Sequence, residues 1–345
     1  MKIITAVMLG AALLLSAAPA SARDPLDDAF DLLTRDQAAG LAALERLIAA
    51  DEPEAMSMVA GIIYAPPPES EVVADPVRAV ALWERALELG SVSAPLNYGT
   101  RLILNDDPAD DERAVEMLQG VREDFAPLAV YPLGRAYLLG HGVEPDMARG
   151  TRLMEAAVEG APGNTDARYL LARAYQNGWG VPVDDAAAYR HMKIAADGGD
   201  PRAQWNVGMM LLSGDGVTAN EGLAFGYVRA SAENGEVSGM ISMAVMLAVG
   251  QGTRIDAAQA RQWYRRAAET GSAHALRGLA GMLLTGEGGR VDAVTGAAYL
   301  DLAAKAGDGN ARQMQQIFAA QLSSLDQGAV EAAKAAWLRD YGIPR

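Results

Sequence analysis

The sequence of 345 residues contains no cysteine, three histidines and four phenylalanines. The absence of cysteine excludes disulfides, thiolate metal sites, cysteine nucleophiles and a lipid anchor attached to cysteine. The histidines, His141, His191 and His274, lie far apart and form no zinc-binding motif. The G-x-S-x-G and S-x-x-K patterns of serine enzymes are also missing. We therefore expect a protein that is not an enzyme and that uses no metal or cofactor.

Long apolar runs are missing too, apart from a short one at the N-terminus. Residues 1–22 have the parts of a secretory signal peptide: Lys2, an apolar run from Ile3 to Leu15, and the cleavage site Ala20-Ser21-Ala22. The apolar run is shorter than a membrane-spanning helix needs. We expect cleavage after Ala22 and a periplasmic or secreted mature protein without a membrane span.

Basic residues are few compared with acidic ones, 29 against 44, which gives a formal net charge of −15. An acidic balance disfavours nucleic acid and anionic lipid as partners. The acidic stretch 106–112 lacks the alternating ligands of a calcium loop, so we expect a solvated turn there. His141, between two turn glycines, is likewise expected to be solvated.

What the sequence does contain is a turn that recurs at steps of 38, 36, 36 and 36 residues. Its leading glycines are Gly140, Gly178, Gly214, Gly250 and Gly286, and the polar residues that follow them are Asp146, Asp184, Asn220, Asp256 and Asp292. Glycine accepts positive φ without steric cost, and Asp or Asn before a helix accepts hydrogen bonds from its first N–H groups. Each unit is therefore predicted to be an antiparallel helical hairpin, stacked on its neighbours.

The repeats divide the chain into four parts. Residues 1–22 are the signal peptide, and residues 126–309 hold five clear repeats. Residues 23–125 are interpreted as an N-terminal cap, with a lone helix over Gln37–Ala49 and two degenerate repeats, the first with Ala65–Glu69 in place of the turn. Residues 310–345 are predicted to be C-terminal capping helices.

Two helices are expected in that C-terminal cap. The first covers Asn310–Leu322, and the second covers Leu325–Asp340 with Asp326 as its N-cap. Trp337 and Tyr341 are available to cover the last apolar face. No stretch has the alternating pattern of a strand, so the fold class is all-α.

The repeats resemble Sel-one-like repeats, relatives of the tetratricopeptide repeat, over most of residues 54–309. One unit shows the pattern in Leu247, Gly250-Gln251-Gly252, Asp256, Ala260, Trp263, Ala267-Ala268 and Gly271. The resemblance implies a right-handed superhelical α-solenoid of about seven helix pairs. It also implies a role in holding other proteins, as an adaptor or scaffold, and it implies no reaction.

The resemblance also suggests where a partner binds. In related repeats the concave surface is lined by first-helix residues that do not face the core, and the equivalent core positions here are Gly134, Ala172, Gly208, Ala244 and Ala280. Positions three before and one after these become candidates, including Ile241 and Val245. The predicted partner-binding residues are Tyr131, Arg135, Tyr169, Arg173, Trp205, Met209 and Arg277. Tyr, Trp, Met and Arg are enriched at interfaces, although an aromatic residue here can instead pack on the adjacent repeat.

Two functions are left open by the sequence. The first is a monomeric periplasmic scaffold that binds a protein partner, by an acidic or extended segment, in its concave groove. The second is an envelope glycan-binding factor for exopolysaccharide assembly or peptidoglycan. A hydrolase is a third and weaker alternative, since it needs a cluster of titratable residues in a pocket.

Overall fold

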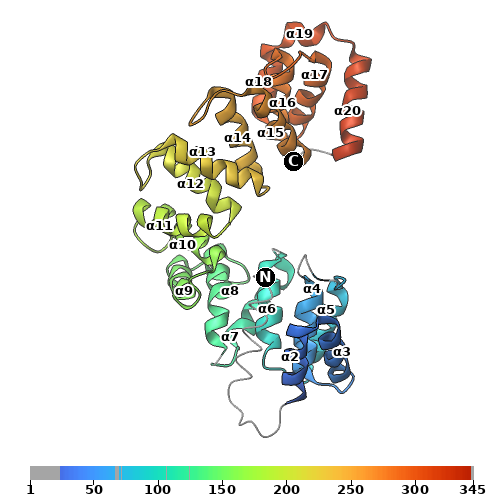
Figure 1. Cartoon of the computed structure of the whole chain (residues 1–345), viewed down its shortest axis with the longest axis vertical. Coiled ribbons are helices and arrows are strands. Elements are labelled where there is room, and N and C mark those ends of the chain that lie inside the picture. Colours follow the sequence, from blue (N-terminus) through green and yellow to red (C-terminus); the bar gives the residue numbers. More distant parts are fainter. Residues whose placement is uncertain (1–23, 67–69, 71, 106, 124, 343–345) are drawn as a thin grey trace. The chain divides into compact units, whose positions relative to one another are not determined.

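The computed structural model describes residues 24–342 except residues 67–69, 71, 106 and 124. Within these residues every regular element is a helix, which confirms the predicted all-α class (Figure 1). The chain forms two compact units, Met1–Pro182 (unit 1) and Val183–Arg345 (unit 2). The predicted signal peptide lies outside the described residues.

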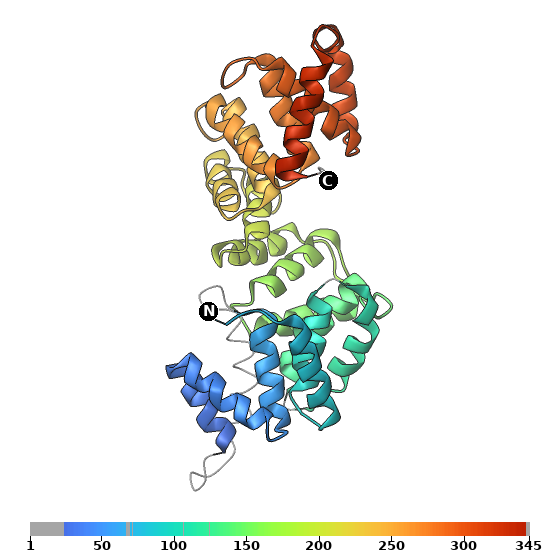
Figure 2. The same ribbon diagram turned by 90° about the vertical axis from the view of Figure 1, so that its right-hand side faces the viewer.

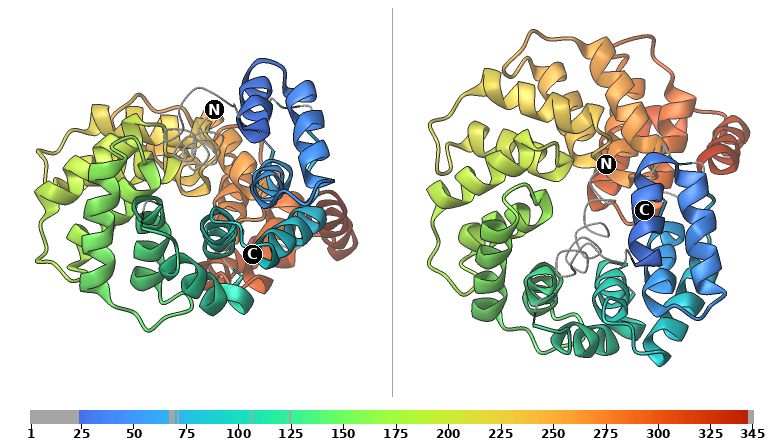
Figure 3. Two further views of the ribbon diagram at one scale, coloured as in Figure 1. Left: turned by 90° about the horizontal axis from the view of Figure 1, so that it is seen from below. Right: turned by 60° about the horizontal axis from the view of Figure 1, so that its bottom comes forward.

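Unit 1 consists of helices that follow one another as antiparallel pairs (Figure 3). The pairs are α2 (Pro25–Arg35) with α3 (Gln37–Ile48), α4 (Pro53–Tyr64) with α5 (Pro76–Glu88), α6 (Ala94–Leu104) with α7 (Asp111–Gln119), and α8 (Ala126–Leu139) with α9 (Met147–Gly160). A 3₁₀ helix, η1 (Pro108–Asp110), precedes α7, and α10 (Thr165–Asn177) ends the unit.

The expectation of a lone helix over Gln37–Ala49 is wrong, because α2 pairs with α3. The start of α2 has strong local signals: Pro25 is its first residue, and the Asp24 side chain accepts a hydrogen bond from the Leu26 N–H at 3.0 Å. Neither signal belongs to the repeat pattern, so the repeat pattern does not predict this helix.

Unit 2 continues the same arrangement. It begins with α11 (Asp185–Asp197), followed by the pairs α12 (Pro201–Ser213) with α13 (Glu221–Glu233), α14 (Val237–Val249) with α15 (Ala257–Glu269), and α16 (Ala273–Thr285) with α17 (Ala293–Lys305). Three helices complete it: α18 (Gly309–Ile317), α19 (Ala319–Ser323) and α20 (Gln327–Tyr341). The prediction of a single helix over Asn310–Leu322 is wrong. The helix is interrupted at Phe318, whose backbone has φ −94° and ψ 10°, and the segment forms the two helices α18 and α19.

The predicted N-caps at the second helices all form. In each case Oδ1 accepts a hydrogen bond at 2.8–3.0 Å from the N–H three residues further on: the residues are Asp146, Asp184, Asn220, Asp256 and Asp292. Asn220 makes the same bond as the aspartates, because its amide oxygen is an equivalent acceptor. These caps fix where each second helix begins.

The two glycines of each turn have different tasks. The first ends the first helix in the left-handed region, at φ between 70° and 84°. The second also has positive φ and lies against the start of the second helix of the preceding repeat. A Cβ there would lie 2.0–2.3 Å from backbone atoms of that helix; these glycines are Gly142, Gly180, Gly216, Gly252 and Gly288. The recurring turn therefore also joins one repeat to the next.

Close approach within a repeat depends on small residues as well. A Cβ on Gly208 would lie 2.6 Å from Cγ2 of Val228 and 3.3 Å from the Ala224 carbonyl oxygen, both in α13. Gly208, one of the aligned core positions, therefore lies where two helices pass closely. Ala267 and Ala268 in α15 are also buried.

The last helix closes unit 2 as predicted (Figure 2). The Asp326 side chain caps α20 by accepting a hydrogen bond from the Gly328 N–H at 2.8 Å. Trp337 is buried between the rings of Tyr299 and Tyr341, at centroid distances of 4.6 and 4.5 Å. The helices of the described part are all too short or too polar to cross a membrane.

Candidate binding face on the first helices

The candidate surface is the first-helix face, defined as the positions three before and one after the core residue of each first helix. The core residues Gly134, Ala172, Gly208, Ala244 and Ala280 are buried, as the sequence alignment of the repeats requires. All ten positions of the first-helix face are partly or fully exposed. The predicted site residues therefore border the core without entering it.

In unit 1 the predicted residues contact other parts of the same unit. Arg135 Nη1 donates a hydrogen bond to the carbonyl oxygen of Ile103 in α6. Arg173 Nη1 donates to the Tyr169 hydroxyl at 3.3 Å, and its guanidinium lies 5.7 Å from the Trp179 ring centroid. The structure brings Tyr169 and Arg173 together, and the two arginines contact the protein's own carbonyl, hydroxyl and ring groups.

Tyr131, the remaining predicted residue of unit 1, packs against an apolar cluster. The cluster contains Leu138, Met154 and Leu171, which come from α8, α9 and α10. Tyr131 thus lies at the junction of two repeats and has a structural role there.

In unit 2 the predicted residues link neighbouring repeats. Trp205 Nε1 donates to the Ser242 hydroxyl at 2.9 Å, which joins α12 to α14. Arg277 Nε donates to Asp308 Oδ2 at 3.0 Å, at the N-cap of α18. Met209, four residues after Trp205 on the same helix, is partly buried. A role of these residues in partner binding stays a prediction.

The most exposed apolar residue among the ten positions of the first-helix face is Val245 on α14, and the exposed Val249 follows it on the same helix, outside these ten positions. Val245 is 41% exposed, and Val249, one turn further along the same side of the helix, is 62% exposed. The equivalents of Val249 in α12 and α16 are Ser213 and Thr285. Val249 was not predicted from the sequence, although a signal was present: the only polar side chains of α14 are Ser238 and Ser242, so this helix has more apolar residues than the core covers.

Two expectations about polar residues are corrected by the structure. His141 is not solvated: its side chain is 23% exposed, and Nδ1 lies 3.9 Å from Asp111 Oδ2. In the acidic stretch, residues 107–110 and Glu112 are exposed as expected, but Asp111 is buried. The Gly142 turn lies against the backbone of Asp111 at the start of α7, and this contact brings the His141 and Asp111 side chains together. Within the described residues no cluster of acidic or histidine side chains could hold a metal ion.

Asp308, the partner of Arg277, is held by hydrogen bonds to both of its carboxylate oxygens. Its Oδ1 accepts a hydrogen bond from the Ala311 N–H at 3.0 Å, while Oδ2 accepts from Arg277. Burial alone would raise the pKa of Asp308, but the hydrogen bonds outweigh burial, and the pKa lies below its usual value. This stabilisation is therefore present above the unfolded pKa of about 3.9 and is lost as pH falls through the folded value.

Asp308→Asn keeps the capping oxygen and removes the charge that pairs with Arg277. We expect it to lower the free energy of unfolding at neutral pH by about 1 kcal/mol. The variant should also lose less stability than the wild type between about pH 6 and pH 3. Thermal denaturation at several pH values measures both effects, and equal acid sensitivity of the two proteins would contradict the assignment.

Helix pairs with these turns and caps define an α-solenoid. The Sel1 repeat family matches residues 53–91, 127–161, 165–200, 201–236, 237–272 and 273–308. These matches cover more than half of the chain, which therefore belongs to the Sel1 repeat family, as its resemblance implied. Sel1 repeat proteins generally serve as non-catalytic scaffolds for protein interactions.

Solved structures show the same fold. A Sel1 repeat protein from Oxalobacter formigenes is 23% identical, with a TM-score of 0.61 over 92% of this chain and 86% of that chain. The protein c5321, a protective antigen of uropathogenic Escherichia coli strains, is 20% identical, with a TM-score of 0.54 over 97% of this chain and 79% of that one. A search of curated proteins by sequence gave no match.

Proposed function

We propose that the protein is a periplasmic scaffold that binds a partner protein through the first-helix face of unit 2. The observation that carries this proposal is the pair of exposed valines on α14, Val245 and Val249, one helical turn apart on the same side of the helix. The positions equivalent to Val249 in the other first helices of unit 2 are the polar Ser213 and Thr285. Exposed apolar side chains next to the packed core of the repeats favour contact with an apolar segment of another protein. The periplasmic location rests on the signal-peptide pattern of residues 1–22.

Of the two kinds of partner segment left open by the sequence, acidic and extended, the exposed valines favour the extended one. The expectation of an acidic segment depended on Arg135 and Arg173, whose guanidinium groups donate to Ile103 and Tyr169. The valines offer no charge and no hydrogen bond. An extended or helical segment with apolar anchors therefore fits this face better than an acidic one.

A photo-crosslinking experiment tests the proposal in the cell of origin. A benzoylphenylalanine residue is placed at position 245, 249 or 223 of the full-length protein. Leu223 on α13 is a matched control, because it is 55% exposed, in the same unit, but on a second helix. We expect the same adduct from positions 245 and 249 and none from position 223.

Purified protein then measures the affinity for the partner found in this way. Val249→Asp should weaken binding roughly tenfold or more, because a charge would be buried against an apolar surface without a partner. Leu223→Asp should leave binding within about twofold, a difference under 0.5 kcal/mol. Both variants should keep the melting temperature of the wild type. Equal adducts at all three positions, or unchanged binding by Val249→Asp, would exclude this face.

A further inference from the structure

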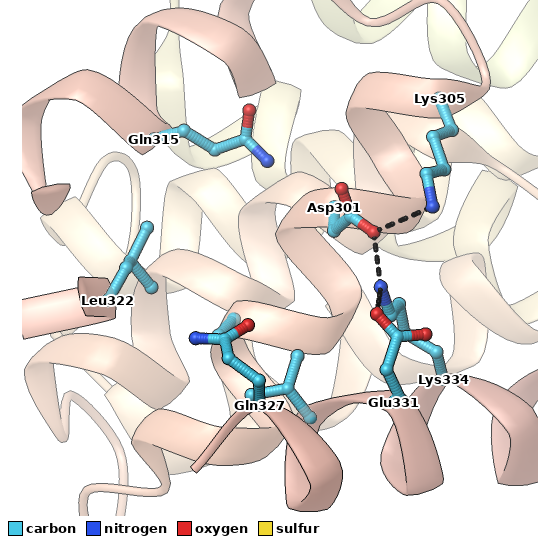
Figure 4. Close-up of a pocket in the computed structure, with 9 residues that line it drawn as sticks. Asp301, Lys305, Gln315, Leu322, Gln327, Glu331 and Lys334 are labelled. Carbon is cyan, nitrogen blue, oxygen red and sulfur yellow. Dashed lines mark hydrogen bonds and ion pairs between the residues drawn. The ribbon is translucent and has the colours of Figure 1, made fainter. Parts of the chain in front are cut away.

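A pocket of about 330 Å³ lies in unit 2 between the last repeat and the C-terminal cap (Figure 4). It is separate from the first-helix valines. Its walls come from α17, α18, α19 and α20, and its volume is at the lower end of ligand pockets, roughly 300–1,000 Å³. The residues that matter for its chemistry are Asp301, Lys305, Gln315, Gln327, Glu331 and Lys334.

The charged groups of the pocket neutralise one another. Lys334 is only 6% exposed, and its ammonium donates to Asp301 Oδ2 at 2.6 Å and to Glu331. Lys305 donates to the same Asp301 oxygen at 3.1 Å. Burial would raise the pKa of Asp301, but the two lysines hold it below its usual range. The four charged side chains are therefore paired with one another, so an ionic ligand would have to break these pairs.

The groups left to meet a ligand are neutral donors and acceptors together with aliphatic surface. Figure 4 shows the Gln315 and Gln327 side chains extending from α18 and α20 on opposite sides of the pocket. Within the described part of the chain, the Gln315 amide makes no hydrogen bond, and Oδ1 of Asp301 takes no part in the ion pairs. Gln327 Nε2 donates to the Leu325 carbonyl oxygen at 3.4 Å, so its Oε1 is the atom left to accept from a ligand. An amide group can donate hydrogen bonds to hydroxyl groups of a ligand and accept from them, and a carboxylate oxygen can accept from them. Leu322 and Val330 can pack against C–H groups of the same ligand.

We infer that this pocket binds a neutral sugar ring. Because the charges of the pocket are paired with one another, they do not attract an ionic ligand. The amides and the carboxylate oxygen can form hydrogen bonds with the hydroxyl groups of a sugar. The aliphatic side chains of the wall can pack against the C–H groups on one face of its ring. The lining contains no aromatic side chain on which the ring could stack, so the affinity should be low, in the millimolar range.

The test uses the mature protein and saturation-transfer NMR with glucose, galactose, mannose and N-acetylglucosamine as probes. Glucuronate, glucosamine and alanine serve as anionic, cationic and zwitterionic comparisons. We expect at least one neutral sugar to bind and the charged compounds to bind more weakly. The binding of an oligosaccharide of the same sugar is then compared with that of the monosaccharide, to show whether the pocket takes the end of a glycan chain or a free sugar. Binding of either one supports the site.

Three variants locate the binding. Gln315→Leu and Gln327→Leu remove one amide each and should weaken sugar binding roughly twofold to tenfold, as expected for one neutral hydrogen bond. Gln313→Leu is the control, because Gln313 is an exposed residue of α18 outside the pocket lining. Melting temperatures confirm that all three fold. The inference fails if no neutral sugar binds at about 100 mM, a concentration that saturates any site of millimolar Kd, if a charged compound binds better, or if Gln313→Leu has the same effect as Gln315→Leu.

Discussion

Replacing Gly252 with alanine is expected to destabilise the protein far more than the same change at Gly271 in the same repeat. Both glycines have positive φ, 67° and 94°, so an alanine at either costs about 1–2 kcal/mol. Only at Gly252 would the new methyl group meet a backbone atom, the Glu221 carbonyl oxygen at 2.1 Å. Moving that backbone costs about 1–3 kcal/mol more. Gly271 has no atom within 4 Å of the added Cβ.

Urea denaturation followed by circular dichroism measures the difference between the two variants. Hydrogen exchange shows where it arises: Gly252→Ala should speed exchange both in its own turn and at the start of α13, which belongs to the preceding repeat. Gly271→Ala should affect only its own turn. If the two variants lose the same stability, the second turn glycine serves only the turn, and the contact between repeats carries little free energy.

Most of the fold could be predicted because its signals are local. A glycine that ends a helix and an aspartate that begins the next act within a few residues, so the five caps were found without knowledge of any tertiary contact. The helix α2 and the break at Phe318 were missed because neither carries the repeat pattern. The contact of Gly252 with Glu221 could not be predicted from the sequence either, because it depends on how one repeat stacks on another.

The candidate site could be predicted only in part. The sequence placed the first-helix face correctly outside the core, because that follows from helical periodicity. It could not show that Arg135 reaches the Ile103 carbonyl or that Trp205 reaches Ser242, because these contacts join residues 32 and 37 positions apart. The pocket near Lys334 depends on how α20 packs against α17, which no motif records.

The second large effect is expected in unit 1, at Trp83. The Trp83 side chain is fully buried, and its ring stacks on Tyr98 at 5.1 Å and lies 5.4 Å from the ring of Tyr64. It therefore joins α5 to α4 and α6. Trp83→Ala removes most of this contact and leaves a cavity, which should cost about 3–5 kcal/mol.

Trp83→Phe is the matched variant, because it keeps an aromatic ring and removes the indole N–H. That N–H is buried without a hydrogen-bond partner in the part of the chain that the structure describes. Leaving such a group unpaired costs about 1–3 kcal/mol, so its removal offsets part of the lost packing. We expect Trp83→Phe to lose less than half of what Trp83→Ala loses, as measured by thermal and urea denaturation.

The ionisation of Tyr98 gives a local test of the same contact. Burial, followed by the nearby Glu84 carboxylate, raises the pKa of Tyr98 to about 12. An exposed tyrosine ionises near pH 10, so this tyrosine contributes stability below about pH 10 that is lost as pH rises toward 12. In Trp83→Ala water reaches Tyr98, and its ultraviolet titration should move toward pH 10, whereas Trp83→Phe should keep the raised value. If Tyr98 titrates as in the wild type while Trp83→Ala loses several kcal/mol, the stability comes from contacts of Trp83 other than the stacked ring.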